Sequence, residues 1–142
     1  MPPPFVHRLR VRYSECDQQG VVFNGHYLFL YDVAVTEWFR EAIGPYDEMV
    51  AGGTDLVVAE ARLRYLSGAR FDEELDIELE LVRLGSTSLT VAPCFRVGDR
   101  VCVEGEVRHV FVDPATKGKQ EIPQPIRDAL AGYEEPTADA TA

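Results

Sequence analysis

The sequence predicts an α+β domain in which one long helix lies against a five-stranded, mainly antiparallel sheet. One stretch, residues 27–42, has the length and the apolar spacing of a long amphipathic helix. One run of alternating apolar and polar residues precedes this stretch, and four such runs follow it in succession. The turns between the later runs are short enough for hairpins, so we expect a mainly antiparallel sheet that wraps around the helix.

A short polar loop separates the first strand from the helix. Residues 5–13 alternate with a period of two, as expected of a half-buried strand, and residues 15–20 form the loop. We predict that Asn24 caps the N-terminus of the helix with its side chain. Gly44 is expected in the left-handed conformation just beyond the helix, and Pro45 prevents its continuation. The apolar side chains of the helix fall on one stripe: Tyr27, Tyr31, Ala34, Trp38 and Ala42.

The rest of the chain is predicted to be a connector followed by four strands. Residues 46–53 form the connector and are expected to hold one short turn. Gly98-Asp99 indicates a hairpin between the last two strands. Pro93 lacks a backbone N–H, which predicts a bulge or an edge position for its strand. The alternating runs that we assign to strands cover residues 57–65, 74–81, 87–97 and 101–112.

Length and composition bound the class of protein. A chain of 142 residues corresponds to about one domain, which we assign to residues 1–133. Residues 134–142 are small, polar and acidic, and are expected to form a disordered tail. No apolar run approaches the roughly 20 residues that span a bilayer, and the N-terminus lacks the apolar segment of a secretory signal. We therefore expect a cytoplasmic protein without a membrane partner.

The net charge and the spacing of cysteines and histidines argue against a nucleic-acid partner, a disulfide framework and a metal site. The chain has 24 acidic and 14 basic residues, a net charge of -10, which argues against nucleic acid as a partner. A few local arginines can still bind an anion against such a background. Cys16, Cys94 and Cys102 lack paired spacing and are expected to be free thiols. The three histidines lack the spacing of metal ligands, so no metal site is expected.

The stretch over residues 11–40, VRYSECDQQGVVFNGHYLFLYDVAVTEWFR, resembles a known family. It is similar to the first third of the hotdog-fold acyl-CoA thioesterases of the 4-hydroxybenzoyl-CoA thioesterase and YbgC-like type. The shared pattern is a strand ending in a Y-x-E-x-D-like run, then G-V-V, a tyrosine, and a helix with a glutamate and an aromatic residue. The later segments GARFDEELDIELELVRLGSTSLTV and HVFVDP also look like this family, so the resemblance covers about residues 5–130.

The resemblance implies a hotdog fold, in which the sheet wraps the central helix. It implies homodimers or homotetramers with the active site at the dimer interface. It also implies hydrolysis of an acyl- or aryl-CoA thioester to a free acid and coenzyme A. No metal or redox cofactor is implied, because coenzyme A enters as part of the substrate.

The same resemblance implies roles for individual residues. The family's catalytic aspartate maps onto Asp17, and its carbonyl-polarising amide maps near Asn24 and Gly25 at the start of the helix. A helix N-terminus offers free N–H groups and a favourable dipole for a developing oxyanion. The expected substrate-binding residues are Gly20, Val21, His26 and Tyr27, with Thr87 and Ser88 supplied by the partner subunit.

Other interpretations of these residues remain open at the level of sequence. Asp17 is also a good turn former, His26 can equally face solvent, and a Cys16 nucleophile is disfavoured because adjacent acids raise a thiol pKa. Many relatives carry histidine where this chain has Asn24 and arginine where it has Val35. These differences support one alternative, a non-catalytic acyl-binding hotdog protein. A second alternative is a hotdog dehydratase or isomerase acting on acyl thioesters, which would need a paired histidine and acid, and only His26 could serve as that histidine.

The phosphates of coenzyme A would need basic partners. Arg8, Arg10 and Arg12 form a basic stripe on the first strand. In the family's strand order this stripe would face Glu78 and Glu80 across the sheet rather than a ligand. The other candidates are not ranked by the sequence: Arg62, Arg64, Arg70 and Arg108.

Overall fold

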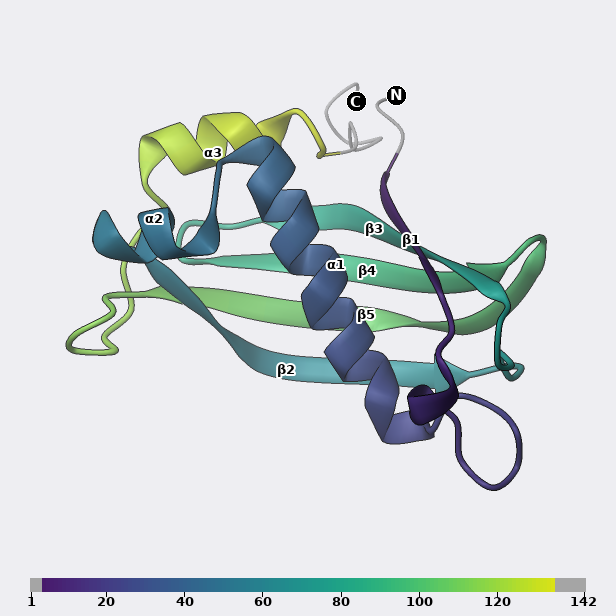
Figure 1. Ribbon diagram of the computed structural model, residues 1–142. Helices are drawn as coiled ribbons and strands as arrows, with labels where there is room; N and C mark the ends of the chain where they lie inside the picture. Colours follow the sequence, from purple (N-terminus) through teal and green to yellow (C-terminus); the bar gives the residue numbers. More distant parts are fainter. Residues whose placement is uncertain (1–3, 135–142) are drawn as a thin grey trace.

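One long helix lies across the face of a five-stranded antiparallel sheet (Figure 1). The computed structural model describes residues 4–134. The sheet has the order β1-β3-β4-β5-β2, and every neighbouring pair is antiparallel. The strands are β1 (Phe5–Arg10), β2 (Asp55–Tyr65), β3 (Glu74–Leu84), β4 (Ser88–Val97) and β5 (Arg100–Val112). The helices are α1 (Tyr27–Ala42), α2 (Tyr46–Ala51) and α3 (Gln124–Ala131). The predicted α+β architecture is confirmed.

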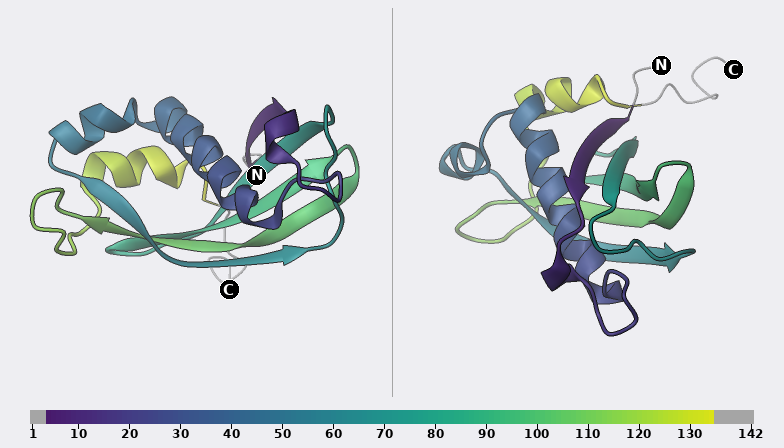
Figure 2. Two further views of the ribbon diagram at one scale, coloured as in Figure 1. Left: turned by 60° about the horizontal axis from the view of Figure 1, so that its bottom comes forward. Right: turned by 45° about the vertical axis from the view of Figure 1, so that its right-hand side comes forward.

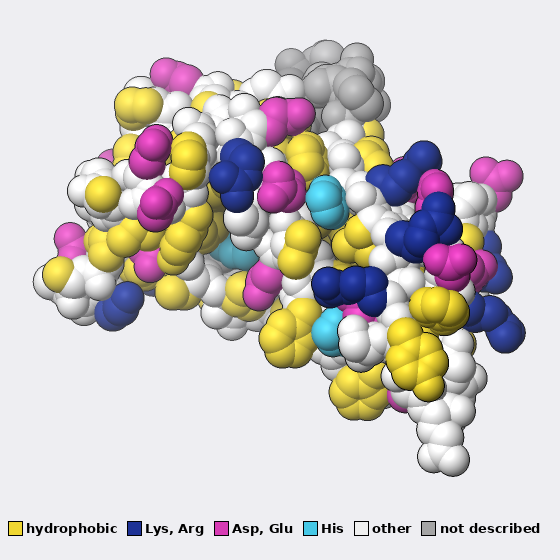
Figure 3. All heavy atoms as spheres, viewed as in Figure 1, with side chains coloured by type: hydrophobic (Ala, Val, Ile, Leu, Met, Phe, Trp, Pro, Cys, Tyr) yellow, Lys and Arg dark blue, Asp and Glu magenta, His cyan; other side chains and the backbone are white. Residues whose placement is uncertain are grey.

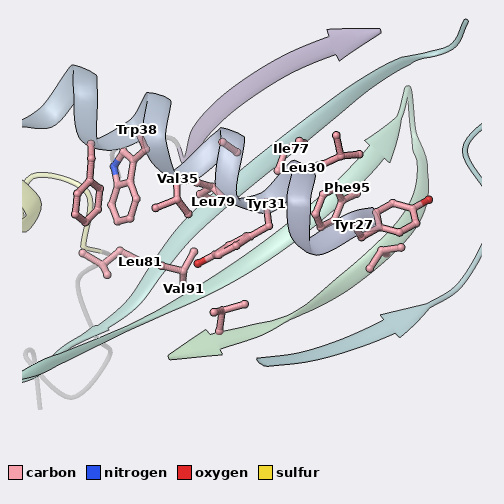
Figure 4. Close-up of a cluster of buried hydrophobic side chains, with 14 of the residues drawn as sticks. Tyr27, Leu30, Tyr31, Val35, Trp38, Ile77, Leu79, Leu81, Val91 and Phe95 are labelled. Carbon is pink, nitrogen blue, oxygen red and sulfur yellow. The ribbon is translucent and has the colours of Figure 1, made fainter. Parts of the chain in front are cut away.

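The core lies between α1 and the concave face of the sheet (Figures 1 and 2). Alternate residues of β3 and β4 are buried, because successive side chains of a strand point to opposite faces. Figure 4 shows Tyr31, Val35 and Trp38 of α1 directed toward Leu81 and Val91 of the sheet. At about 25 cal/mol for each Å² of apolar surface removed from water, this burial is the main force that holds the helix on the sheet.

The C-terminal end of α1 agrees with the prediction, and the N-terminal end does not. At the C-terminus, Gly44 has the expected positive φ, 136°, and its N–H donates to the Phe39 carbonyl at 2.9 Å. At the N-terminus the prediction of an Asn24 cap is wrong. Residues Asn24–His26 form a 3-10 turn that runs into α1, and no side chain caps either helix. Asn24 lies inside that turn, so its side chain is not in the capping position.

The arginines of β1 pair with acids of β3, because these two strands are neighbours as expected. Arg8 Nε lies 2.7 Å from Asp76 Oδ1, and Arg10 Nη2 lies 2.9 Å from Glu74 Oε1. The register places Arg8 opposite Asp76 and Arg10 opposite Glu74, so the partners are not the two predicted glutamates further along β3. The strand β1 also ends earlier than predicted, because the chain turns after residue 12 into a short 3-10 helix.

Two features of the later chain depart from the sequence prediction. Pro93 lies in β4, the middle strand of the sheet, and not at an edge or a bulge. The pairs between β4 and β5 stop at Val91 and resume at Cys94, which accommodates the missing proline N–H. The helix α3 was not predicted, because it spans only 8 residues and buries only Ile126 and Leu130.

The sequence predicted no membrane-spanning segment and a disordered C-terminal tail. Within residues 4–134 no helix is both long and apolar enough to cross a bilayer. Of the predicted tail, residues 134–142, the structure describes only Glu134, which bridges to Leu81. The rest of that prediction lies outside the described residues.

Candidate active site

Backbone hydrogen bonds in the loop between β1 and α1 fix the position of Asp17. The Asp17 N–H donates to the Val21 carbonyl, and the Gly20 N–H donates to the Asp17 carbonyl, both at 2.9 Å. Gly20 has a φ of 80°, which favours glycine and closes the turn. The Gln19 N–H donates to Oδ1 of Asp17 at 2.8 Å. The second carboxylate oxygen of Asp17 has no hydrogen-bond partner among residues 4–134.

Asp17 borders a hollow of about 470 Å³ between this loop, the start of α1 and the end of β2. Three other residues predicted for the site, Val21, Asn24 and Tyr27, line the same hollow. The end of β2 contributes Tyr65, whose hydroxyl donates to the Asn24 carbonyl at 3.0 Å. The remaining lining residues are Gln19, Val22, Leu66, Ser67 and Gly68. We call this space the Asp17 hollow.

The floor of the Asp17 hollow requires a glycine at position 68. A Cβ added there would lie 2.5 Å from Cγ1 of Val21, closer than side chains approach one another. The segment after β2 therefore packs directly on the loop, and the Val22 N–H donates to the Ala69 carbonyl at 2.8 Å. Val21 also bridges to Arg70. This pairing holds the loop that carries Asp17 against the sheet.

The 3-10 turn that leads into α1 has two free backbone donors, and one of its residues, Asn24, lines the hollow. Among the described residues, no group accepts a hydrogen bond from the backbone N–H of Asn24 or Gly25. Both residues are exposed and lie in the 3-10 turn that precedes α1. Free N–H groups at a helix N-terminus carry partial positive charge, so they can stabilise an oxyanion.

Glu15 is a buried carboxylate that ties the loop to the start of the helix. It is 2% exposed and accepts the Arg12 N–H at 2.7 Å and Arg12 Nη2 at 2.8 Å. Nε2 of His26 lies 3.4 Å from its second oxygen. Burial raises the pKa of Glu15, but the hydrogen bonds from Arg12 and His26 outweigh it and bring that pKa below its ordinary value. The sequence did not single out Glu15, although the Y-x-E-x-D pattern contains it.

The other predicted site residues fall in different places. His26 is half-buried and directed at Glu15, rather than lining the Asp17 hollow. Thr87 and Ser88 lie at the start of β4, where Ser88 pairs with Val110. That end of the sheet is opposite the loop that carries Asp17 (Figure 1). A single chain therefore does not bring Thr87 and Ser88 to Asp17.

Neither a thiol nor a metal is favoured at this site. Burial, together with the charges of Glu15 and Asp17, raises the pKa of Cys16, which makes its thiol a poor nucleophile at neutral pH. The part of the chain that the structure describes contains no group of three His, Cys, Asp or Glu side chains placed to hold a metal ion.

A second hollow of about 360 Å³ lies along the middle of α1, beside the start of β2. Its walls are mostly apolar, and its polar groups are Asp32, Thr36, Tyr46 and His109. Nε2 of His109 lies 2.7 Å from the Tyr31 hydroxyl. Burial lowers the pKa of His109 to about 4, so the imidazole is neutral at pH 7. The sequence analysis did not predict this hollow.

The model of the Thioesterase-like superfamily matches residues 11–130 of the chain. The chain belongs to this family. It is 29% identical over 119 residues to the acyl-CoA thioester hydrolase YbgC of Escherichia coli O6:H1, an alignment that covers 83% of this chain and 89% of that protein. The predicted class of enzyme, a thioester hydrolase, is thereby confirmed.

Solved structures share the fold over nearly their whole length. A hypothetical protein from Thermus thermophilus superposes with a TM-score of 0.84 at 29% identity, covering 91% of this chain and 98% of that one. A protein of the thioesterase superfamily from Jannaschia sp. CCS1 superposes with a TM-score of 0.88 at 21% identity, covering 96% and 99%. The predicted hotdog fold is confirmed.

Proposed function

We propose that this protein hydrolyses acyl- or aryl-CoA thioesters to a free acid and coenzyme A, with Asp17 as the general base or nucleophile. The observation that carries the proposal is that Asp17 and the start of the turn with free N–H groups, Asn24, line one hollow. The turn holds one oxygen of Asp17, and the other has no partner among the described residues. Asn24, whose backbone N–H has no acceptor among the described residues, lines the same hollow, and Gly25 with its free N–H is the next residue of the turn.

Two routes use the same arrangement. Asp17 can remove a proton from water as the water attacks the thioester carbonyl, or it can add to the carbonyl directly and form an anhydride that water then opens. In either route the carbonyl oxygen becomes negative, and the N–H groups of Asn24 and Gly25 stabilise it. Coenzyme A then leaves as the thiolate. Tyr65 supports these donors, since its hydroxyl holds the Asn24 carbonyl.

We further propose that the active site forms between two copies of the chain paired along β2. This strand is an edge of the sheet, and its residues 57–62 are exposed. Val57 and Val58 are 42% and 48% exposed, and Tyr65 and Leu66 are each 52% exposed. An open edge with apolar side chains favours pairing with another strand, and a two-fold axis makes that pairing self-complementary.

The proposed pairing of two β2 strands places the Asp17 hollow of one copy next to the second hollow of the other copy. Antiparallel pairing of two β2 strands would set the end of one strand opposite the start of the other. The Asp17 hollow at Tyr65 would then adjoin the partner's hollow at the start of β2. That second hollow is lined by Val35, Phe39, Leu56 and Val58, which suits an apolar acyl group.

Release of free thiol from a short, a medium and an aromatic acyl-CoA tests the activity. We expect turnover with at least one of them, and the panel then ranks the acyl groups. Binding of the acyl-CoA without thiol release would contradict hydrolysis and favour a carrier protein. Formation of an enoyl or rearranged thioester, with the thioester bond intact, would favour a dehydratase or isomerase.

Matched valines on the two edge strands test the assembly. Val58 on β2 and Val6 on β1 are 48% and 47% exposed. We expect Val58→Lys to yield monomers in analytical ultracentrifugation and to lose thioesterase activity, because each lysine would place a charge at the paired edge. Val6→Lys should leave the assembly intact. Equal behaviour of the two variants would contradict pairing along β2.

A further inference from the structure

Two aromatic side chains remain on the surface on the other side of the Asp17 loop. Tyr13 is 81% exposed and Phe71 is 55% exposed. Their ring centroids lie 5.9 Å apart, and the rings meet edge to face at 83°. Such a pair in water leaves one ring face open to a planar ligand.

These rings border a hollow of about 480 Å³ that shares Asp17 with the proposed catalytic site. Gln18 and Gly20 of the same loop also line it. The two hollows therefore lie on either side of one tight turn. A ligand that places its thioester at Asp17 and carries a long flexible arm can reach the aromatic pair by crossing this turn.

Arg70, which directly precedes Phe71 in the chain, has no ionic partner among the described residues. Among the described residues, side chains of Arg70 and Arg83 make no hydrogen bond or ion pair, whereas every other arginine has an acceptor. Figure 3 shows basic and acidic side chains interleaved beside β1, as expected where arginines form ion pairs with acids. Arg83 lies near the far end of β3, while Arg70 bridges to Val21 in the Asp17 loop.

The acids next to Arg70 are compensated by other groups. Both oxygens of Glu73 accept from Arg100 Nη2, at 3.0 and 3.1 Å. Asp72 lies 3.8 Å from Arg10, whose guanidinium also donates to the Asp72 carbonyl. Arg70 therefore keeps a positive charge that its own neighbours do not neutralise, in a protein whose net charge is -10. Such a charge favours an anion at this place.

We infer that Tyr13, Phe71 and Arg70 form the seat for the nucleotide end of coenzyme A. An aromatic face stacks on a purine, and a guanidinium binds phosphate through charge-assisted hydrogen bonds. This inference rests on the proposed function, since it assigns the substrate's non-reacting end to a place beside the same loop. It also ranks Arg70 above the other arginines that the sequence offers for the phosphates.

A pair of substrates tests the seat: one acyl group carried by coenzyme A, and the same acyl group carried by pantetheine, which lacks the nucleotide. For Arg70→Ala, we expect the ratio of kcat/KM for the CoA thioester to that for the pantetheine thioester to fall about tenfold, as for a lost charge-assisted hydrogen bond. Phe71→Ala should lower the ratio by about fivefold or more, as for a lost stacking contact. Arg83→Ala is the matched control and should leave the ratio unchanged.

Calorimetric titration with adenosine 3′,5′-bisphosphate tests the same seat without catalysis. We expect the wild type to bind this nucleotide and Arg70→Ala to bind it about tenfold more weakly. An unchanged ratio in Arg70→Ala, or an equal fall in Arg83→Ala, would overturn the inference while leaving the proposed hydrolysis intact. If the wild type hydrolyses neither thioester, the proposed function is contradicted, and the titration alone decides whether the nucleotide seat exists.

Discussion

Replacing Glu15 by glutamine tests how the catalytic loop is held. The buried carboxylate accepts from the Arg12 N–H at 2.7 Å and from the Arg12 guanidinium at 2.8 Å, and it lies 3.4 Å from His26. The Arg12 side chain is 73% exposed, so its ion pair contributes on the order of 0.5 kcal/mol. The backbone donor faces a charged acceptor, and that hydrogen bond contributes about 1.5 kcal/mol. Glutamine keeps one acceptor oxygen but places an N–H₂ group where the second oxygen lay.

We therefore expect Glu15→Gln to lower the free energy of unfolding by about 2 kcal/mol, or Tm by about 8 °C. Urea unfolding at pH 7 measures the change. Glu74→Gln is the matched control, because Glu74 is exposed and, within residues 4–134, its carboxylate forms ion pairs only with arginines of β1. Its loss should be on the order of 0.5 kcal/mol or less. Equal effects of the two substitutions would refute the role that we give to Glu15.

Three further changes test the surroundings of the site. The folded-state pKa of Glu15 lies below 4.5, so the stability that its carboxylate contributes is complete above that pH and disappears as pH falls through the lowered value. Melting curves should therefore show that the wild type loses stability more steeply in acid than Glu15→Gln does. Parallel pH dependences of the two melting temperatures would contradict this. Tyr65→Phe should lower kcat by about threefold to tenfold, as expected for one hydrogen bond, with little change in Tm; an unchanged kcat would exclude support of the oxyanion donors by Tyr65. Gly68→Ala should lower the free energy of unfolding by about 1–3 kcal/mol through the clash with Val21. Gly132→Ala is the control and should not lower it, because a Cβ there meets only an ordinary contact. Similar melting temperatures for both variants would contradict the close packing of residue 68 on Val21.

The sequence predicted the C-terminal end of the long helix to the residue, because two independent signals agree there. The apolar stripe ends at Ala42, and Gly44 and Pro45 follow at once. At the other end the signal was weaker. A good capping residue, Asn24, says nothing about the 3-10 turn into which the loop folds, so the predicted cap was wrong.

The contacts that hold the site residues in place were harder to predict, because they join parts of the chain that are distant in sequence. Tyr65 is 41 residues from Asn24, and no local pattern indicates that the two meet. Glu15 lies in a polar loop, where a carboxylate is ordinarily exposed, and only its tertiary contacts bury it. Thr87 and Ser88 lie far from Asp17 within one chain, so their proposed role depends on a partner subunit.

Thiol release by Asp17→Asn, compared with Asp113→Asn, tests the central claim most directly. Both aspartates accept backbone N–H groups in tight turns, Asp17 from Gln19 and Asp113 from Ala115 and Thr116. Asparagine can preserve those turns but cannot act as a base or nucleophile. We predict that Asp17→Asn lowers kcat by about a hundredfold or more with the melting temperature retained, as for a lost general base, and that Asp113→Asn stays active. Full activity in Asp17→Asn would show that Asp17 does not carry the chemistry and would contradict the account.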